Sequence, residues 1–230
     1  DEAEAYHAIQ LFLQHIDRTQ NDSFVHANLG PADTRAGRLI LRATEELACA
    51  IPNITLKYDP AVTPDDYLQL AARVALKTAK PSFANHPMEK ADFGTEDYAI
   101  ASCYNGFPIG GGGYTLVRLR LSHLAKKTDS PEVFLNELLP MAVGQMAAVI
   151  GERIRFLVEE TPFFESSFLV KEGFIHRGLF SGMFGVVGLA EAVNHLLGAV
   201  EEKDRFGRGE AANQLGLTII ETLDRLVKGC

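Results

Sequence analysis

The sequence predicts an α/β fold with substantial parallel sheet. Segments whose apolar residues recur at helical spacing alternate with short strand-like segments along the 230 residues. Apolar residues make up 47% of the chain, which is enough for one large core or two small ones. No internal repeat, low-complexity linker or convincing boundary interrupts the pattern, so we expect a single α/β domain over residues 1–230.

Helical and strand-like segments follow one another in turn in the first half of the chain. Residues 2–20 carry apolar side chains at helical spacing, and "SFVHANLG" after them indicates a short strand. Asp33 is expected to cap the second helix, and Thr63 to open a third with Pro64 at its first position. We expect one sheet to hold strands near residues 24–27, 54–58, 82–84, 99–102 and 114–119.

The second half of the chain is more helical. A helix is expected to start at Ser130 and Pro131 and to kink or restart at Pro140. The apolar runs "SSFLVKEG" and "MFGVVGL" are short enough for strands, and we interpret them so. Residues 190–197 and 210–227 complete the expected helices.

Composition excludes several classes of partner. The formal net charge of −8 is spread along the chain without a basic block, so we expect no nucleic-acid partner and no membrane partner. Residues 1–4 lack a signal-peptide pattern, and no apolar stretch of about 18 residues runs without a polar break, which predicts a cytoplasmic protein. The three cysteines form no CxxC pair, and the histidines lack metal-ligand spacing, so neither disulfides nor bound metal are expected.

A run of glycines, residues 110–113, follows a lone cysteine in "YAIASCYNGFPIGGGGYTLVRLRL". A phosphate-binding loop is one interpretation. In such loops, however, the glycines lie between a strand and a helix, and here they lead into the strand-like "YTLVRLRL". We favour the second interpretation, in which the glycines allow backbone segments to approach closely.

Cys103 also has two interpretations. A cysteine at the end of an apolar strand is usually an inert buried thiol. An ionic nucleophile would need a nearby cation, and no His or Lys lies within ten residues of Cys103 in the sequence. A thiyl radical forms by loss of a hydrogen atom, so it needs an enclosed position at the tip of an inward loop, which flanking glycines permit.

Five segments in the same order resemble the central part of the YjjI-type glycyl radical enzymes, relatives of pyruvate formate-lyase and anaerobic ribonucleotide reductase. The segments are "FVHANLGPAD", "NITLKYDPAVTPDD", "ASCYNGFPIGGGGYTLVRLRL", "FFESSFLVKEG" and "MFGVVGLAEAVNHL". The resemblance covers nearly all of the chain. It implies part of a ten-stranded α/β barrel with outer helices, incomplete in this chain. It also implies a finger loop at residues 103–113 and Cys103 as the thiyl cysteine that abstracts hydrogen from a small polar substrate.

The same resemblance implies that this chain itself binds no cofactor. In the full-length parent, the radical would be stored on a C-terminal glycine. A separate radical S-adenosylmethionine activating enzyme with a 4Fe-4S cluster would install it. An R-V-x-G-Y type segment does not occur in this sequence, so we expect the chain to be a fragment that is inactive alone.

The neighbours of Cys103 depart from two branches of the superfamily. Dehydratases carry a glutamate base two residues after the cysteine, where this sequence has Asn105. Pyruvate formate-lyase has a double cysteine, whereas Ser102 and Tyr104 flank Cys103 here. Simple dehydratase acid–base chemistry and acyl transfer are therefore disfavoured, and the substrate is unassigned.

Polar residues beside Cys103 or close to the ends of expected strands are the candidate substrate-binding residues. They are Tyr104, Asn105, His26, Asn28, Asn85 and Glu165. Hydration, turn formation or a solvated surface is the alternative for each of them. A non-catalytic α/β small-molecule-binding or assembly module is the alternative function. Because an incomplete barrel exposes apolar edges, we also expect a homo-oligomer.

Overall fold

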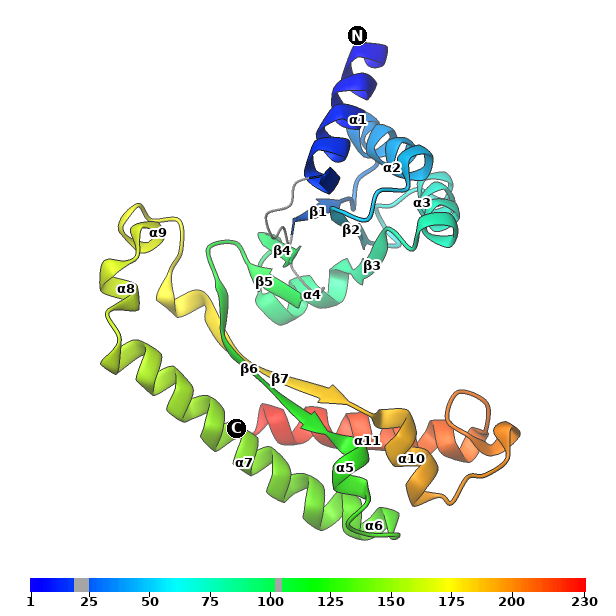
Figure 1. Ribbon diagram of the computed structural model, residues 1–230, viewed down its shortest axis with the longest axis vertical. Coiled ribbons are helices and arrows are strands. Elements are labelled where there is room, and N and C mark those ends of the chain that lie inside the picture. The colour runs from blue at the N-terminus through cyan, green and yellow to red at the C-terminus, as the bar shows by residue number, and fades with distance from the viewer. Residues whose placement is uncertain (19–24, 102–104) are drawn as a thin grey trace. The chain divides into compact units, whose positions relative to one another are not determined.

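The computed structural model of the protein describes residues 1–18, 25–101 and 105–230 (Figure 1). Contacts divide the chain into two compact units, Asp1–Gly110 and Gly111–Cys230. The division falls inside the run of four glycines. The sequence shows no boundary there and predicts a single domain.

The described part of the first unit contains a parallel sheet, a hairpin and helices that cross between the strands. Its helices are α1 (Glu2–Arg18), α2 (Arg35–Leu47), α3 (Asp65–Thr78) and α4 (His86–Phe93). Its strands are β1 (His26–Leu29), β2 (Asn53–Tyr58), β3 (Ser82–Asn85), β4 (Tyr98–Ala101) and β5 (Asn105–Pro108).

Strands β1, β2 and β3 form a parallel sheet in that order, with His26 opposite Asn53 and Thr55 opposite Ser82. Helix α2 connects β1 to β2 and α3 connects β2 to β3. Figure 1 shows α1, α2 and α3 side by side. The core between sheet and helices consists of Leu29, Leu41, Ile54, Leu56, Tyr67, Ala71 and Val74. In this arrangement the carboxyl ends of all three strands lie at one edge of the sheet.

The starts of α2 and α3 differ from the predicted caps. Thr34, one residue after Asp33, caps α2 because its hydroxyl accepts a hydrogen bond from the Gly37 N–H at 3.0 Å. The Asp33 prediction is wrong. Thr63 does not cap α3, since its hydroxyl instead donates to the Pro31 carbonyl at 2.9 Å and ties two loops together.

The described part of the second unit pairs a two-stranded parallel sheet with long helices. The strands are β6 (Gly112–Arg120) and β7 (Phe180–Val187). The regular helices are α5 (Leu121–Ala125), α6 (Pro131–Val133), α7 (Leu139–Arg155), α8 (Phe163–Ser166), α9 (Phe168–Lys171), α10 (Leu189–Leu196) and α11 (Glu210–Lys228). The wider and tighter helical turns are η1 (Phe134–Leu138), η2 (Phe156–Glu160), η3 (Arg177–Leu179) and η4 (Glu202–Asp204).

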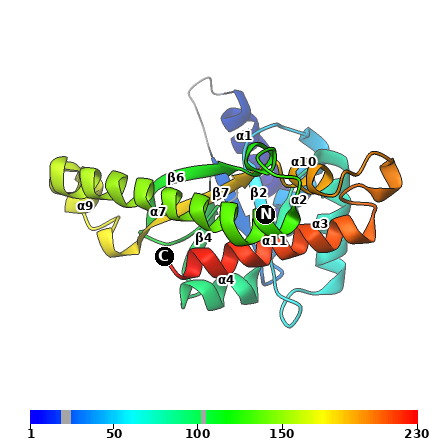
Figure 2. The ribbon, with the colours of Figure 1, turned by 90° about the horizontal axis from the view of Figure 1, so that it is seen from below.

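Helices α7 and α11 contact one another in this unit, and Figure 2 shows both beside the strands β6 and β7. Ser130 caps the start of α6 as predicted, because its hydroxyl accepts from the Val133 N–H at 3.3 Å. The helix does not restart at Pro140, since the helical segment Pro131–Glu160 is continuous. The π-helical segment η1 precedes it, and wider turns of this kind accommodate a residue that lacks an N–H group.

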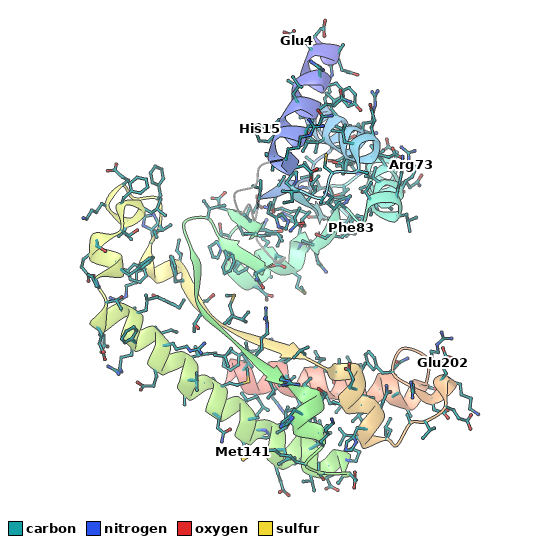
Figure 3. All side chains as sticks on the ribbon, viewed as in Figure 1. Glu4, His15, Arg73, Phe83, Met141 and Glu202 are labelled. Atoms are coloured by element: carbon teal, nitrogen blue, oxygen red, sulfur yellow. The ribbon has the colours of Figure 1, made fainter. Side chains whose placement is uncertain are left out.

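The continuous helical segment Pro131–Glu160 is long and apolar enough to cross a membrane by length and composition alone. Core helices of soluble proteins pass the same test. Phe134, Leu139 and Val143 from this segment lie in the main core of the second unit, packed with residues of α5, α10 and α11. Met141 lies on the exposed side of α7 (Figure 3).

Two further expectations are wrong for the described residues. The predicted single sheet is absent there, because the strands form three separate sheets, β1-β2-β3, β4-β5 and β6-β7. The run "SSFLVKEG" holds the last residue of α8 and all of α9 instead of a strand, and such short apolar runs fit a helix or a strand equally well by pattern. The predicted finger loop, residues 103–113, contains strand β5 and the start of β6. The ten-stranded barrel stays a prediction.

The first prediction concerns Gly37, which lies in α2 against Tyr67. A Cβ at residue 37 would lie 2.3 Å from the Tyr67 hydroxyl oxygen, and that buried hydroxyl has no hydrogen-bond partner among the described residues. Gly37→Ala should therefore destabilise the chain by about 1–3 kcal/mol, although alanine normally favours a helix. Tyr67→Phe should be neutral or stabilising and should restore most of the stability lost in Gly37→Ala.

Urea unfolding of the single variants and the double variant measures this coupling. A Gly37→Ala chain as stable as the wild type would contradict the predicted overlap. The same stability loss with and without Tyr67→Phe would show that the hydroxyl is not its cause.

A second prediction concerns Lys80, which is only 6% exposed. Its ammonium donates hydrogen bonds to the carbonyls of Cys49, Ala50 and Pro52, at 2.5, 3.1 and 3.0 Å. Lys80→Met keeps the aliphatic stem but removes the donor, so we expect a loss of at least about 2 kcal/mol. Lys77→Met is the matched control, since Lys77 is exposed on α3. Equal unfolding free energies for the two variants would contradict the prediction.

Candidate functional site

The candidate site lies in the first unit, where the carboxyl ends of the parallel strands meet β4. Five side chains gather there: Asn28 from β1, Lys57 from β2, His86 and Glu89 from α4, and Tyr98 from β4. We call this group the carboxyl-edge cluster. Ligand sites of open α/β sheets occur at this edge, because loops and helix starts converge there.

Asn28 joins β1 to β4 through its side chain. Its Oδ1 accepts from the Ile100 N–H at 2.8 Å, and its Nδ2 donates to the Ile100 carbonyl at 2.8 Å. A carboxamide carries the same donor and acceptor as a peptide group, so Asn28 satisfies the Ile100 backbone as a neighbouring strand would. The amide predicted to bind substrate thus has one donor and one acceptor bonded to the backbone of β4.

Lys57 bonds to the backbone of β4 at Tyr98, two residues before Ile100. Its ammonium donates to the Tyr98 carbonyl at 2.5 Å and lies 3.9 Å from the centroid of the Tyr98 ring. Burial lowers the pKa of Lys57, while the charges of Asp97 and Glu89 oppose that shift. The lysine therefore contributes a hydrogen bond and a cation–π contact at once.

Tyr98 is the buried centre of the cluster. Its hydroxyl bonds with Nδ1 of His86 at 2.9 Å, and the His86 and Phe93 rings lie 5.7 and 5.6 Å from its own ring. Burial, with a smaller contribution from the charge of Glu89, raises the pKa of Tyr98 to about 12. At neutral pH the phenol is thus uncharged and ties α4 to β4.

Glu89 is the carboxylate of the cluster, and it faces β5. A Cβ at Gly106 would lie 2.8 Å from Glu89 Oε2 and 3.0 Å from the Phe93 ring, so glycine is what gives the carboxylate its room. No described residue donates a hydrogen bond to this carboxylate. Burial raises the pKa of Glu89, as does the charge of Asp92, and Lys57 lowers it. A carboxyl whose pKa is raised keeps its proton to a higher pH than an ordinary glutamate does.

Asn85 and His26 have local partners. The Asn85 side chain caps α4 by accepting from the Met88 N–H at 3.2 Å, which fixes the helix that carries Glu89. The His26 Nε2 lies 2.7 Å from the Thr55 hydroxyl, which in turn lies 2.6 Å from the Ser82 hydroxyl. These polar contacts cross all three strands of the sheet.

The remaining predicted site residues fall in different places. Cys103 and Tyr104 lie outside the described residues. Asn105 begins β5 opposite Ala101, the last residue of β4. Glu165 is exposed on α8 in the second unit. The prediction missed Lys57, Glu89 and Tyr98; the position of Lys57 at the end of the strand-like "NITLKY" was the available signal.

The second unit carries a different kind of cavity. A groove of about 570 Å³ lies between the start of β6 and α7, and Arg153 donates across it to the Thr115 hydroxyl at 3.2 Å. Its walls include the apolar side chains of Val149 and Leu157. Within the described ranges, no group of three or more metal-binding side chains occurs in either unit.

Comparison with known proteins identifies the class to which this scaffold belongs. The family model described as "Glycyl radical enzyme YjjI-like" matches residues 1–230, and the chain belongs to this family. An uncharacterized protein of Haemophilus influenzae is 47% identical over 226 residues, 98% of this chain and 44% of that protein. The uncharacterized protein YjjI of Escherichia coli is 44% identical over 219 residues, 95% of this chain and 42% of that protein. The chain thus spans less than half the length of these relatives.

Solved structures show the same fold at low identity. The anaerobic ribonucleotide reductase from Thermotoga maritima with citrate in the active site aligns with a TM-score of 0.70 and 13% identity, over 99% of this chain and 47% of that chain. A second anaerobic ribonucleotide reductase aligns with a TM-score of 0.69 and 12% identity, over 99% of this chain and 41% of its own length. The expected family and the α/β class with parallel sheet are confirmed.

The raised pKa of Glu89 predicts a pH-dependent effect of Glu89→Gln on stability. Ionised Glu89 is disfavoured in the folded state, so the wild type loses stability as the pH rises through the folded pKa. The variant lacks this loss. Relative to the wild type, the variant should gain stability as the pH rises from the ordinary glutamate pKa to the raised pKa of folded Glu89, and the gain should be small because Glu89 is only half-buried.

Glu96→Gln is the matched control with the opposite sign. Lys90 pairs with Glu96 and lowers the pKa of that exposed carboxyl. The wild type therefore gains stability as the pH rises from this lowered pKa to the ordinary glutamate pKa, and Glu96→Gln should lose relative stability over that more acidic range. Urea unfolding at several pH values measures both trends. The prediction would be contradicted if the free energy of unfolding of Glu89→Gln, relative to that of the wild type, stayed constant or fell as the pH rises.

Proposed function

We propose that this chain is the cysteine-bearing part of a glycyl radical enzyme that abstracts hydrogen from a small polar substrate through Cys103. The observation that carries the proposal is the pairing of Ala101 with Asn105. Cys103 is the middle residue of the three that connect these paired positions in the sequence. The hairpin is bound on its β4 side by the carboxyl-edge cluster, and family membership supports the radical chemistry.

The chemistry needs no ionic activation of the thiol. A thiyl radical at Cys103 would take a hydrogen atom from a substrate C–H bond, so that an S–H bond forms and a carbon radical remains. The thiol would return a hydrogen atom to the product radical in the closing step. This route suits a sequence neighbourhood without His or Lys, because the reacting sulfur never has to be a thiolate.

The radical would be stored on a glycine of the full-length protein, since the chain spans less than half of its relatives. A separate radical S-adenosylmethionine activating enzyme with a 4Fe-4S cluster would generate it. This chain alone would be inactive and would bind none of these groups itself. The enzyme would act in the cytoplasm.

Self-association of the chain is part of the same proposal. Large apolar side chains remain exposed on the second unit, among them Phe156, Phe168 and Phe174 at 55%, 64% and 62%. Exposed apolar patches of this kind favour covering by another polypeptide surface, in a homo-oligomer or in the full-length protein. They also favour the second candidate function, an assembly module that uses the scaffold without catalysis.

Solvent deuterium tests the role of Cys103 without a known substrate. A glycyl radical has one α-hydrogen and gives a doublet in its electron paramagnetic resonance spectrum. In D2O the thiol becomes S–D. Repeated transfer of hydrogen and deuterium atoms between the sulfur and the glycyl carbon then replaces the α-hydrogen by deuterium. The doublet therefore collapses. Cys103→Ser substitutes a much stronger O–H bond, so collapse should slow by more than about 100-fold, since each 1.4 kcal/mol on the barrier is about tenfold.

The experiment uses the full-length protein, activated anaerobically, at matched radical content. Cys49→Ser and Cys230→Ser are the controls. In both variants the glycyl doublet should collapse at the wild-type rate. Collapse of the doublet in Cys103→Ser as fast as in the wild type would remove this residue from the proposed mechanism.

A further inference from the structure

The edge of β4 that does not face β5 is satisfied by side chains. In the hairpin, Ile100 lies opposite Gly106, yet both backbone groups of Ile100 bond to the Asn28 carboxamide. The Tyr98 carbonyl bonds to Lys57 in the same way. No described strand pairs with this edge, since β4 has β5 as its ladder partner and β1 pairs with β2.

We propose that Asn28 and Lys57 together form a clamp that positions the segment leading from β4 into Cys103. The inference rests on the proposed function, because it assigns the two residues to placing the thiol. Ile100 precedes Cys103 by three residues, and Tyr98 by five. Both are held from the carboxyl ends of neighbouring parallel strands, which belong to the first unit's core sheet.

The contacts of Asn28 and Lys57 explain how these two side chains fix the position of β4. The amide of Asn28 supplies a donor and an acceptor to one residue, so it fixes both the position and the direction of the strand there. The half-buried Lys57 holds the Tyr98 carbonyl and ring together, which fixes the rotation of the strand two residues earlier. A strand held at two alternate residues cannot slip by one residue without breaking both contacts.

Hydrogen transfer is sensitive to such placement. A misplacement of about 1 Å costs on the order of 100-fold in reactions that depend on positioning. Loss of either contact should therefore slow transfer between Cys103 and the glycyl radical even where the fold survives. A purely structural role would lower the melting temperature but leave the transfer rate at matched radical content unchanged.

The test measures collapse of the glycyl doublet in D2O in full-length, activated protein. Asn28→Leu and Lys57→Met should each slow the collapse by at least about tenfold. Lys57→Arg keeps a cation and donor over the Tyr98 ring and should restore most of the rate. Asn28→Asp keeps only the acceptor for the Ile100 N–H and should give an intermediate rate. Lys77→Met, which changes an exposed residue of α3, is the matched control. Its glycyl doublet should collapse at the wild-type rate.

Amide hydrogen exchange of the 230-residue chain gives an independent readout. In Asn28→Leu the Ile100 N–H loses its acceptor, so its exchange should become at least about tenfold faster, while amides of β2 should be unchanged. If Asn28→Leu does not fold, Asn28→Asp and Lys57→Met decide the question, because Asn28→Asp keeps the acceptor for the Ile100 N–H and Lys57→Met leaves the Asn28 contact intact.

The outcomes separate this inference from the proposed function. A wild-type doublet that fails to collapse in D2O would count against the role of Cys103 itself. A doublet that collapses in the wild type and equally fast in Asn28→Leu and Lys57→Met would overturn the clamp and leave the role of Cys103 standing. Slow collapse in both variants, with rescue by Lys57→Arg, is the result expected.

Discussion

The structure of the candidate site depends on one constraint, that the backbone polar groups along the outer edge of β4 need partners. A buried peptide group without a partner costs about 1–3 kcal/mol, so this edge must be paired by a strand, by water or by side chains. Here Asn28 and Lys57 supply the partners for Ile100 and Tyr98. The hairpin is therefore joined to the parallel sheet without being a member of its ladder.

The glycine and aromatic residues around the hairpin follow from this junction. Tyr98 of β4 contacts α4 on the other side of this junction, with its hydroxyl 2.9 Å from Nδ1 of His86. Gly106 then leaves room for Glu89 against β5. Because the cluster is sheltered from water, its ionisable groups shift in the expected directions: the pKa of Lys57 falls, and the pKa of Glu89 rises. Packing thus supplies a carboxyl with altered acidity where the sequence shows only an ordinary glutamate.

Local patterns predicted the parallel strands well and their assembly poorly. The segments that form β1, β2 and β3 are marked by apolar runs and turn residues, so local sequence was enough to find them. Grouping all strands in one sheet failed because pairing is decided by contacts between residues far apart in the chain. Asn28 and Ile100 are separated by 72 residues, and nothing local to either indicates that a side chain replaces a strand. For the same reason the sequence indicates Asn28 as a functional residue without indicating its contact with Ile100, and it does not single out Lys57.

A side-chain junction also gives the hairpin a property that a backbone ladder would lack. Any sequence of suitable conformation can extend a ladder, and a ladder permits register shifts by two residues that keep the same groups outward. The junction at β4 instead requires a carboxamide at one position and a long cation with an aromatic ring at another. A shift by two residues would set Asn28 against Tyr98 and leave Lys57 without its ring contact. The register of β4, and with it the number of residues between the last fixed contact and Cys103, is therefore set by chemically specific partners.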